Sequence, residues 1–246
     1  EAVYQRCLDL GVSFEFNTPV EKINHTKRRV TGVTLKGGRV VGASIVVANT
    51  DASLVYNSLI STKFRKTKGA RKRIARSTQS LAGFSLLLGL RPDESATPIN
   101  HHTILFPEDY DAEFDSIFTT RTPVKNPTIY LCAPLDESMV KESGAQSLFV
   151  LVNAPVHDAT GATGWNWNDE NFNRDYANSI IDQIEARGIS IRDRLEVLEI
   201  RTPADLERSV SAPGGAIYGT SSNGAKSAFL RARNRSPLKG LYCVGG

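Results

Sequence analysis

The feature that most constrains the fold is the run Ile45-Val46-Val47-Ala48, which is continuously apolar and rich in β-branched residues. Such a run is typical of a strand buried on both faces, an environment found mainly in parallel sheets covered by helices. The polar residues 49–51 follow and can cap a helix, which we expect over 52–60. The segment therefore predicts a parallel strand leading directly into a helix, as in α/β folds.

Hydrophobic periodicity predicts further elements on both sides of this strand. Strands are expected at 14–16, 30–35, 40–41, 81–90, 103–106, 128–133, 148–152, 194–202 and 240–244, and helices at 2–10, 111–118, 168–187 and 204–208. The clearest helix is 168–187, in which Phe172, Tyr176, Ile180 and Ile184 recur every four residues. The mixture indicates an α/β (α+β mixed) fold class.

Composition excludes several classes of protein. The 246 residues are 40% apolar and 23% charged, which is ordinary for a globular chain. No apolar run reaches the roughly 18 residues that a transmembrane helix needs, and no signal segment opens the sequence. The three cysteines lie far apart, so we expect neither a disulfide framework nor a thiolate metal site, and we expect a cytoplasmic, reducing setting.

Common catalytic motifs are missing from the sequence. It has no GxSxG elbow, HExxH, CxxC or Walker loop. His101 and His102 are adjacent, and on a strand neighbouring side chains face opposite sides, so we expect no metal site there. Carboxylates such as Asp51 and Asp93 are explained by capping and turns, and we assign no catalytic residue.

The net charge of +4 is concentrated in one segment, residues 63–76, which holds eight cations and no acid. Three interpretations stay open: a solvated face, a contact with anionic lipid head groups, or a contact with nucleic-acid phosphates. Only Phe64 is available nearby for base stacking, which disfavours nucleic acid. The segment therefore predicts a peripheral contact with a membrane surface as its functional alternative.

Both chain ends look cut. The sequence begins at Glu1 within an expected helix, contains one methionine, and ends on Gly245 and Gly246 after an apolar strand. Ligands of open α/β sheets bind at the carboxyl ends of strands, and glycines let a phosphate or flavin approach the backbone. Two glycines after a strand more often form a simple turn than a ligand contact. We expect the sequence to be a segment of a longer protein.

Several stretches carry a resemblance to a known family. They are ANTDASLVYNSLI, HHTILFPEDYDAEFDSIF, PTIYLCAPLDESM, SLFVLVNAPV and APGGAIYGTSSNGAKSAFLRARNRSPLKGLYCVGG. Together they make the chain similar to the carboxyl-terminal half of bacterial phytoene desaturase-type carotenoid desaturases, within the amine-oxidase-like flavoproteins. The resemblance covers essentially all residues, and HHTILFP and the final 35 residues are its most specific parts.

The resemblance implies an FAD site to which this chain contributes secondary contacts. Val20 matches the strand that pairs with the adenine edge. Ala48 and Asn49 match the strand end near the dinucleotide, and Gly245 and Gly246 match the start of the second flavin motif. These five residues are the predicted cofactor contacts.

The resemblance also implies a domain plan and a reaction. Residues 1–52 and 237–246 would belong to a Rossmann-like FAD-binding domain, and 53–236 would form an inserted substrate domain, a mixed sheet with helices on one face. The implied reaction dehydrogenates carbon–carbon bonds of a hydrophobic polyene such as phytoene, with a hydride passing to the flavin and a proton leaving the adjacent carbon. The apolar strand residues could line a polyene tunnel or simply form a core.

Alternatives from other classes stay open. A carotenoid isomerase or a retinol-saturase-like flavoprotein would share the fold and differ in reaction. A non-catalytic fragment could bind polyene or lipid without turnover. An amine or amino-acid oxidase would need polar substrate anchors, which the apolar middle of the chain disfavours. The sequence does not indicate an oligomeric state.

Overall fold

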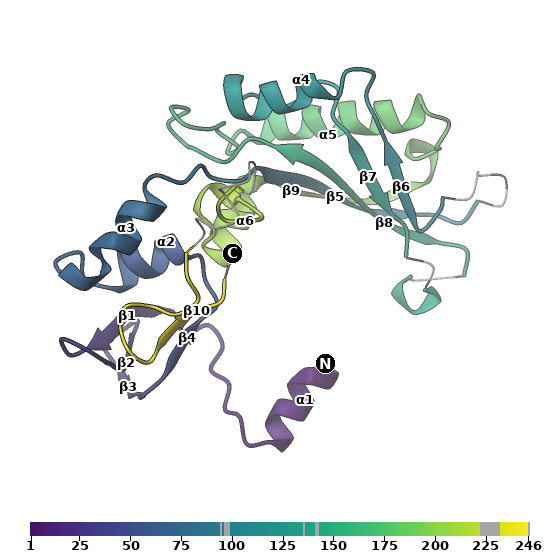
Figure 1. The fold of residues 1–246 in the computed structure, drawn as a ribbon. Helices are drawn as coiled ribbons and strands as arrows, with labels where there is room; N and C mark the ends of the chain where they lie inside the picture. Colours follow the sequence, from purple (N-terminus) through teal and green to yellow (C-terminus); the bar gives the residue numbers. More distant parts are fainter. Residues whose placement is uncertain (94, 96–98, 135, 141–142, 222–231, 246) are drawn as a thin grey trace. The chain divides into compact units, whose positions relative to one another are not determined.

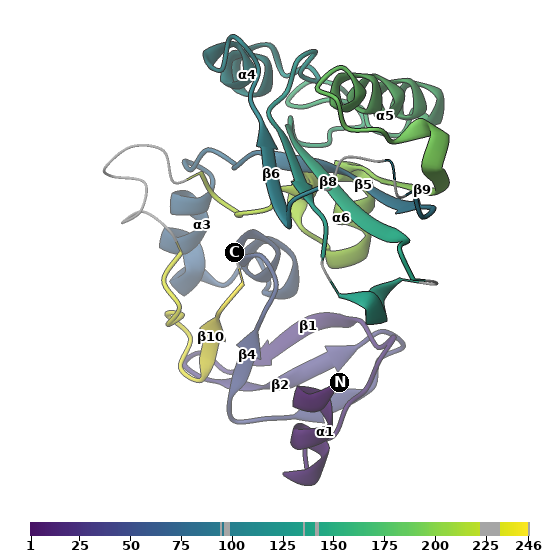
Figure 2. The same ribbon diagram turned by 90° about the vertical axis from the view of Figure 1, so that its right-hand side faces the viewer.

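The computed structural model describes residues 1–93, 95, 99–134, 136–140, 143–221 and 232–245 (Figures 1 and 2). The chain forms two compact units. Unit 1 comprises residues 1–74 and 232–244, and unit 2 comprises 75–231 with the last residues of the chain. Each unit has its own hydrophobic core, so each is described by itself.

Unit 1 combines two small sheets with short helices. Its elements are α1 (Ala2–Asp9), β1 (Val20–His25), β2 (Val30–Leu35), β3 (Val40–Gly42), β4 (Val46–Ala48), α2 (Ala52–Leu54), α3 (Lys68–Ile74) and β10 (Leu241–Cys243). The order β1-β2-β3 makes an antiparallel sheet, whereas β4 and β10 pair in parallel. The predicted parallel strand is therefore confirmed, and its partner comes from the opposite end of the sequence.

The core of unit 1 lies against the β4–β10 pair and is built around buried residues of several segments. They are Ile23, Val30, Ala52, Val55, Tyr56, Ile60, Leu238, Leu241 and Cys243. Asp51 starts α2 because its carboxylate accepts a hydrogen bond from the Ser53 backbone at 2.7 Å. A π-helical turn, Val55–Leu59, extends α2 into this core. The predicted strand-to-helix transition is thus confirmed.

The structure corrects three expectations in unit 1. Val47 is 59% exposed and Ile45 is 61% exposed, so the apolar run is not buried on both faces, because β4 pairs with one strand and packs one face on the core. Residues 14–16 are not a strand, and the rings of Phe14 and Phe16 stack with centroids 5.9 Å apart. Helix α3 formed within the basic segment, where no helix was expected.

Unit 2 is built on a five-stranded sheet. Its strands are β5 (Ala82–Leu90), β6 (His102–Leu105), β7 (Ile129–Cys132), β8 (Gln146–Ala154) and β9 (Leu195–Arg201), in the order β6-β7-β8-β5-β9. All its neighbouring strands pair antiparallel, whereas we expected a mixed sheet. The neighbours β8-β5 and β5-β9 are not consecutive in the sequence, so the order of the strands includes crossovers.

Two helical segments lie on the same side of this sheet, α4 (Asp111–Phe114) and α5 (Glu170–Glu185) (Figure 1). Asp169 caps α5 by accepting hydrogen bonds from two backbone N–H groups, and Tyr176, Ile180 and Ile184 bury the predicted apolar stripe. Helix α6 (Pro203–Val210) begins at a capping box formed by Thr202 and Asp205. The expectation of helices over one face is confirmed for α4 and α5.

Alternation along the strands divides the sheet of unit 2 into two faces. Phe84, Leu86, Val150 and Val152 point into the core with the helices. The opposite side, which we call the open face, is lined by Leu87, His102, Ile104, Tyr130, Cys132, Phe149 and Leu151. Strand register makes it continuous, since Phe149 lies opposite both Cys132 and Leu87, and Tyr130 lies opposite both Ile104 and Leu151.

The compact units do not coincide with the predicted domains. Residues 53–74 belong to unit 1 in the structure, because Val55, Tyr56 and Ile60 are part of its core. Residues 232–236 also group with unit 1. The division into domains 1–52, 53–236 and 237–246 stays a prediction about the longer protein.

Candidate functional site

The carboxyl ends of the parallel strands β4 and β10 lie side by side (Figure 2). Ala48 is opposite Cys243, and the Val244 backbone N–H donates to the Ala48 carbonyl at 2.9 Å. Asn49 is exposed directly after β4, and Gly245 comes one residue after Val244. Because ligands of parallel sheets bind at this edge, the predicted contacts Ala48 and Asn49 occupy a suitable place.

Thr50 adds a polar group at the same edge. Its Oγ1 is buried and has no hydrogen-bond partner among the described residues. A buried hydroxyl without a partner is costly, by about 1–3 kcal/mol, so such groups commonly meet water or a ligand. The donor and acceptor chemistry of Thr50 therefore fits a polar ligand group beside Asn49. From the sequence, Thr50 is expected only as a capping residue before the helix.

The structure does not bring the predicted cofactor contact Val20 to this edge. Val20 begins β1 and pairs with Leu35, in the antiparallel sheet rather than the parallel pair. Its side chain is exposed, so a ligand can reach it. Gly246 lies outside the described residues. The roles of all five residues in binding FAD stay predictions.

Two titratable groups lie beneath this edge in the core of unit 1. The Cys243 thiol donates to the Tyr56 hydroxyl oxygen, with the sulfur and oxygen 3.9 Å apart. Burial raises the pKa of Tyr56 to about 12 and also raises the pKa of the Cys243 thiol above its ordinary value. Both groups are therefore neutral at physiological pH, and Cys243 is poorly suited to nucleophilic chemistry.

The open face of unit 2 offers a second kind of surface. Ile104 is 51% exposed and Leu87 is 37% exposed, while Tyr130, Phe149 and Leu151 are half-buried between them. Clustered exposed apolar side chains of this kind commonly mark a binding surface. An elongated apolar molecule would find continuous contact along it.

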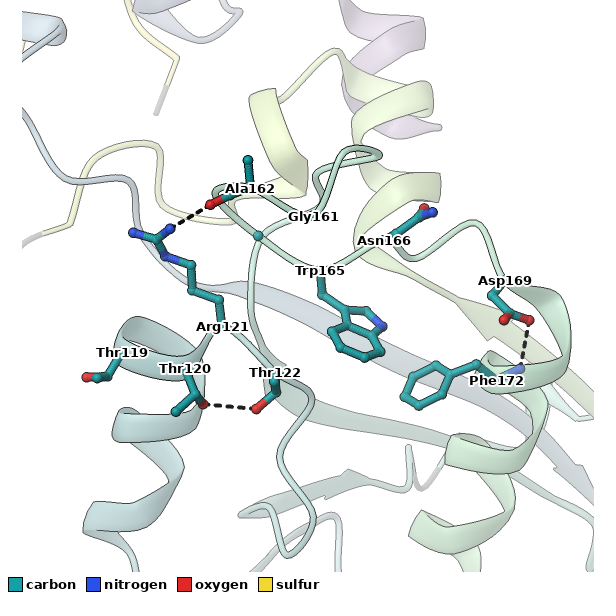
Figure 3. A pocket seen from close by; sticks show the side chains of 11 residues that line it. Thr119, Thr120, Arg121, Thr122, Gly161, Ala162, Trp165, Asn166, Asp169 and Phe172 are labelled. Atoms are coloured by element: carbon teal, nitrogen blue, oxygen red, sulfur yellow. Dashed lines mark hydrogen bonds between the residues drawn. The ribbon is translucent and has the colours of Figure 1, made fainter.

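Two hollows lie elsewhere in unit 2. One, of about 500 Å³, is lined by Arg121, Trp165 and Phe172, and the Arg121 guanidinium donates to the Ala162 carbonyl at 2.8 Å (Figure 3). The other, of about 1060 Å³, lies between α4 and α5 and has charged groups such as Lys125 and Arg187 along its wall. Charged walls make this larger hollow less suited to a hydrocarbon than the open face is.

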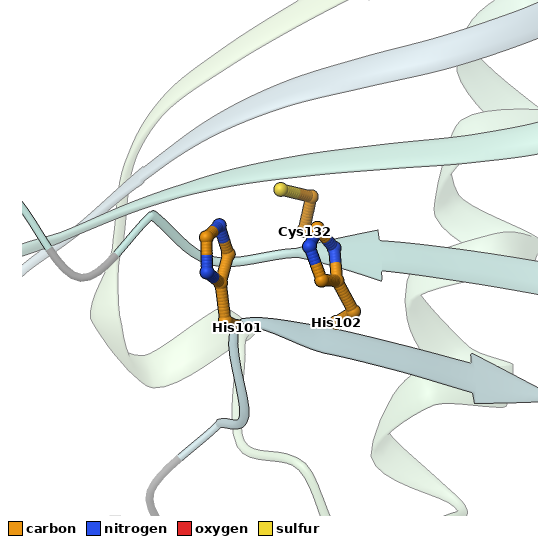
Figure 4. Close-up of side chains that lie close together, drawn as sticks. All are labelled: His101, His102 and Cys132. Atoms are coloured by element: carbon orange, nitrogen blue, oxygen red, sulfur yellow. The ribbon is translucent and has the colours of Figure 1, made fainter.

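His101 and His102 do not face opposite sides as expected. His101 precedes β6 instead of belonging to it, and the two imidazole rings stack with centroids 4.2 Å apart (Figure 4). The thiol of Cys132 lies beside them, and ligand atoms of the three residues are within 4.8 Å of one another. The sequence alone carries no signal for this cluster, because it depends on the pairing of β6 with β7, which places His102 opposite Cys132.

One cation of the basic segment, Arg71, holds the surrounding backbone through hydrogen bonds. The Arg71 guanidinium donates hydrogen bonds to the carbonyls of Thr62, Phe64 and Tyr56 and to Thr67 Oγ1, so it points into unit 1. The side chains of Lys63, Lys66, Lys68 and Lys72, in contrast, are exposed. In the part of the chain that the structure describes, we find no helix with the length and apolar character needed to cross a membrane.

Comparison with solved structures supports the fold. The chain matches a crystal structure of an oxidoreductase from Methanosarcina mazei with a TM-score of 0.53 and 16% sequence identity. The match covers 93% of this chain and 43% of that one. The two proteins therefore share an α/β fold.

Sequence comparison identifies relatives along the whole chain, although no family model matches it. A 1-hydroxycarotenoid 3,4-desaturase of Flavobacterium sp. is 32% identical over 100% of this chain and 48% of its own length. A hydroxyneurosporene desaturase of Rubrivivax gelatinosus is 32% identical, over 96% and 43% respectively. A lycopene-forming phytoene desaturase of Pseudescherichia vulneris is 28% identical, over 96% and 47%. The chain therefore spans about half the length of the curated relatives it matches, and it is related over that whole span to the carotenoid desaturases of the phytoene desaturase type.

Proposed function

We propose that this chain supplies the carboxyl-terminal half of an FAD-dependent oxidoreductase that dehydrogenates carbon–carbon bonds of a carotenoid such as phytoene. The similarity to carotenoid desaturases along the whole chain carries the proposal. A hydride and a proton leave neighbouring carbons in each step, and a double bond forms between these carbons. The fold shared with an oxidoreductase agrees with this chemistry.

The open face is the surface we assign to the polyene. Leu87, Phe149 and Leu151 provide apolar contact across neighbouring strands, and Tyr130 adds an aromatic ring. Burying such side chains against a hydrocarbon gains about 25 cal/mol per Å² of apolar surface removed from water. Contact of this kind is nondirectional, so it would hold an elongated substrate without polar anchors.

The edge of β4 and β10 is the part of this chain that we assign to FAD. Ala48, Asn49 and Gly245 would approach the cofactor through their backbone, and Thr50 Oγ1 would gain a hydrogen-bond partner. Val20 would contribute through β1, and Gly246 through the residues beyond Gly245. Flavin, when bound, supplies the acceptor for a hydride from an unactivated carbon–carbon bond. The residues of this chain would orient the cofactor and the substrate and would exclude water from the reacting bond.

Isomerase and saturase activities are the runner-up functions. They differ from the proposed reaction in the hydrogen content of the product, because isomerisation removes no hydrogen and saturation adds it. A fragment that only binds polyene would give no product at all. The product therefore distinguishes these alternatives directly.

The decisive experiment uses the full-length protein that contains this chain, supplied with FAD and phytoene in detergent or vesicles. We expect products with longer conjugation, detected by chromatography with absorbance spectra. An isomerised or a saturated product would identify one of the alternatives and contradict the proposal. A flavin spectrum of the purified protein tests cofactor binding independently of turnover.

A substitution on the open face tests the substrate surface. Leu87→Glu should lower activity at least tenfold, because a carboxylate cannot be buried against a hydrocarbon without losing its hydration. Val210→Glu introduces the same charge on an exposed apolar residue of α6 and is the matched control. Equal activity of the two variants, with unchanged circular dichroism, would show that the polyene binds elsewhere.

We also propose that the enzyme is cytoplasmic and meets the membrane surface peripherally through the basic segment. Exposed lysines near an anionic membrane contribute about 1 kcal/mol each. The triple variant with Lys66, Lys68 and Lys72 changed to Gln should bind anionic vesicles more than tenfold more weakly. The control changes Lys22, Lys27 and Lys36, which are equally exposed cations of the same unit. Equal binding of both triple variants contradicts the assignment.

A further inference from the structure

We propose that His101, His102 and Cys132 form a binding site for a transition-metal ion of the zinc class. Ligand atoms of the three side chains lie within 4.8 Å of one another (Figure 4). Two of the residues are exposed and the third is half-buried, so an ion can enter from solvent. His102 and Cys132 lie on the open face that we assign to the polyene, but no hydride or proton transfer and no flavin contact is assigned to the cluster.

Backbone pairing holds the three ligands in register. His102 lies directly opposite Cys132 in the antiparallel pair β6–β7. The Ala133 backbone N–H donates to the His101 carbonyl at 2.9 Å, which extends the pairing past the strand end. Side chains opposite each other in such a pair have Cβ atoms about 5 Å apart, so modest side-chain rotations bring nitrogen and sulfur onto one ion.

Tyr130 lies beside the site and contacts one of its histidines. Its hydroxyl is 2.8 Å from His102 Nδ1 and belongs to the same face of the sheet. In the tautomer in which Nδ1 donates this hydrogen bond, Nε2 presents its lone pair to an incoming ion. Metal-binding histidines are commonly oriented in this way, by a hydrogen bond from the nitrogen that does not bind the metal.

The donor set selects the kind of ion. Imidazole nitrogen and thiolate sulfur suit Zn²⁺ and its neighbours, whereas Mg²⁺ and Ca²⁺ prefer oxygen. Binding converts the Cys132 thiol to a thiolate, and the released proton goes to solvent. Three protein ligands leave a fourth tetrahedral position for water.

The test measures Zn²⁺ affinity of the full chain by competition with a chromophoric chelator. We expect one ion per chain, with Cys132→Ser and His102→Gln each weakening binding at least tenfold. Cys7→Ser and His25→Gln remove one thiol and one imidazole from outside the cluster and are the matched controls. Circular dichroism verifies that all four variants stay folded.

Alkylation of the unsubstituted protein gives a second readout that needs no variant. Zn²⁺ should slow alkylation of Cys132 and leave the rate at Cys7 unchanged, as peptide mass spectrometry can measure. The proposal is overturned if micromolar Zn²⁺ does not bind. It is also overturned if the Cys132→Ser variant binds Zn²⁺ as tightly as the parent, or if Zn²⁺ leaves Cys132 unprotected.

Discussion

The Asn153 side-chain amide donates a hydrogen bond of 2.8 Å to the carboxylate of Glu113, 40 residues away in the sequence. Glu113 is only 1% exposed, and its second oxygen accepts from the Thr128 backbone N–H, also at 2.8 Å. The carboxylate thus joins α4, the start of β7 and the end of β8. A buried carboxyl group whose two oxygens are both held by donors has a structural role rather than that of a catalytic base.

Removing this carboxylate should destabilise unit 2. Glu113→Ala leaves the Thr128 N–H and the Asn153 amide, both half-buried, without their acceptor, and we expect a loss of about 2–4 kcal/mol in the free energy of unfolding. Urea denaturation followed by circular dichroism measures the loss. Glu108→Ala removes an exposed carboxylate from a neighbouring position and should change stability by less than about 0.5 kcal/mol. Equal losses in the free energy of unfolding for the two substitutions would contradict this structural role of Glu113.

Arg71 should matter for stability, unlike its neighbour in the basic segment. Its guanidinium satisfies three backbone carbonyls, so Arg71→Ala should lower the free energy of unfolding by about 2 kcal/mol. Lys72→Ala removes an exposed cation and should have almost no effect on stability. An equal fall of the thermal or urea midpoint in both variants would contradict the structural role of Arg71.

Gly32 should resist substitution. Its φ is +143°, and an added Cβ would lie 2.1 Å from the Val41 carbonyl oxygen in the neighbouring strand. We expect Gly32→Ala to destabilise unit 1 by about 3 kcal/mol through steric overlap. Gly69→Ala, within α3 and with no atom near its added Cβ, should instead stabilise by about 0.5–1 kcal/mol. The urea midpoint should fall relative to the parent for Gly32→Ala and rise for Gly69→Ala, so the direction of the shift distinguishes the two sites.

Asp158 should make stability depend on pH. Hydrogen bonds from the Thr160 side chain, and from the backbone and side chain of Thr163, hold the pKa of its carboxyl well below the ordinary range. Because the folded-state pKa is the lower one, the stabilisation is complete above the unfolded pKa of about 3.9 and is lost as pH falls through the folded value.

The variant Asp158→Asn measures this contribution. Its urea midpoint should lie below that of the parent at pH 7, and the gap should narrow as the pH is lowered past about 3.9. Asp175→Asn alters an exposed carboxyl of α5 and should show no such gap. A gap that stays constant from pH 7 to acid would mean that the carboxyl charge contributes nothing.

The local pattern of apolar and polar residues was sufficient to predict many of the helices and strands. The four-residue repeat of Phe172, Tyr176, Ile180 and Ile184 predicted α5, because a helix needs only its own apolar stripe and caps. Short apolar runs predicted β5 and β8, and the resemblance predicted the family. The strand at 14–16 failed, since Phe14 and Phe16 alternate correctly but gain no partner strand within the described chain.

The sequence by itself determined the helices and strands that carry a strong periodicity, the α/β class and the relationship to carotenoid desaturases. Only the tertiary structure decided which distant residues meet. The pairing of β6 with β7 brings Cys132 to the two stacked histidines, and the packing of α4 buries Glu113 against Asn153. The physical reason is that strand register and the burial of polar groups depend on contacts between remote segments, which local propensity does not encode.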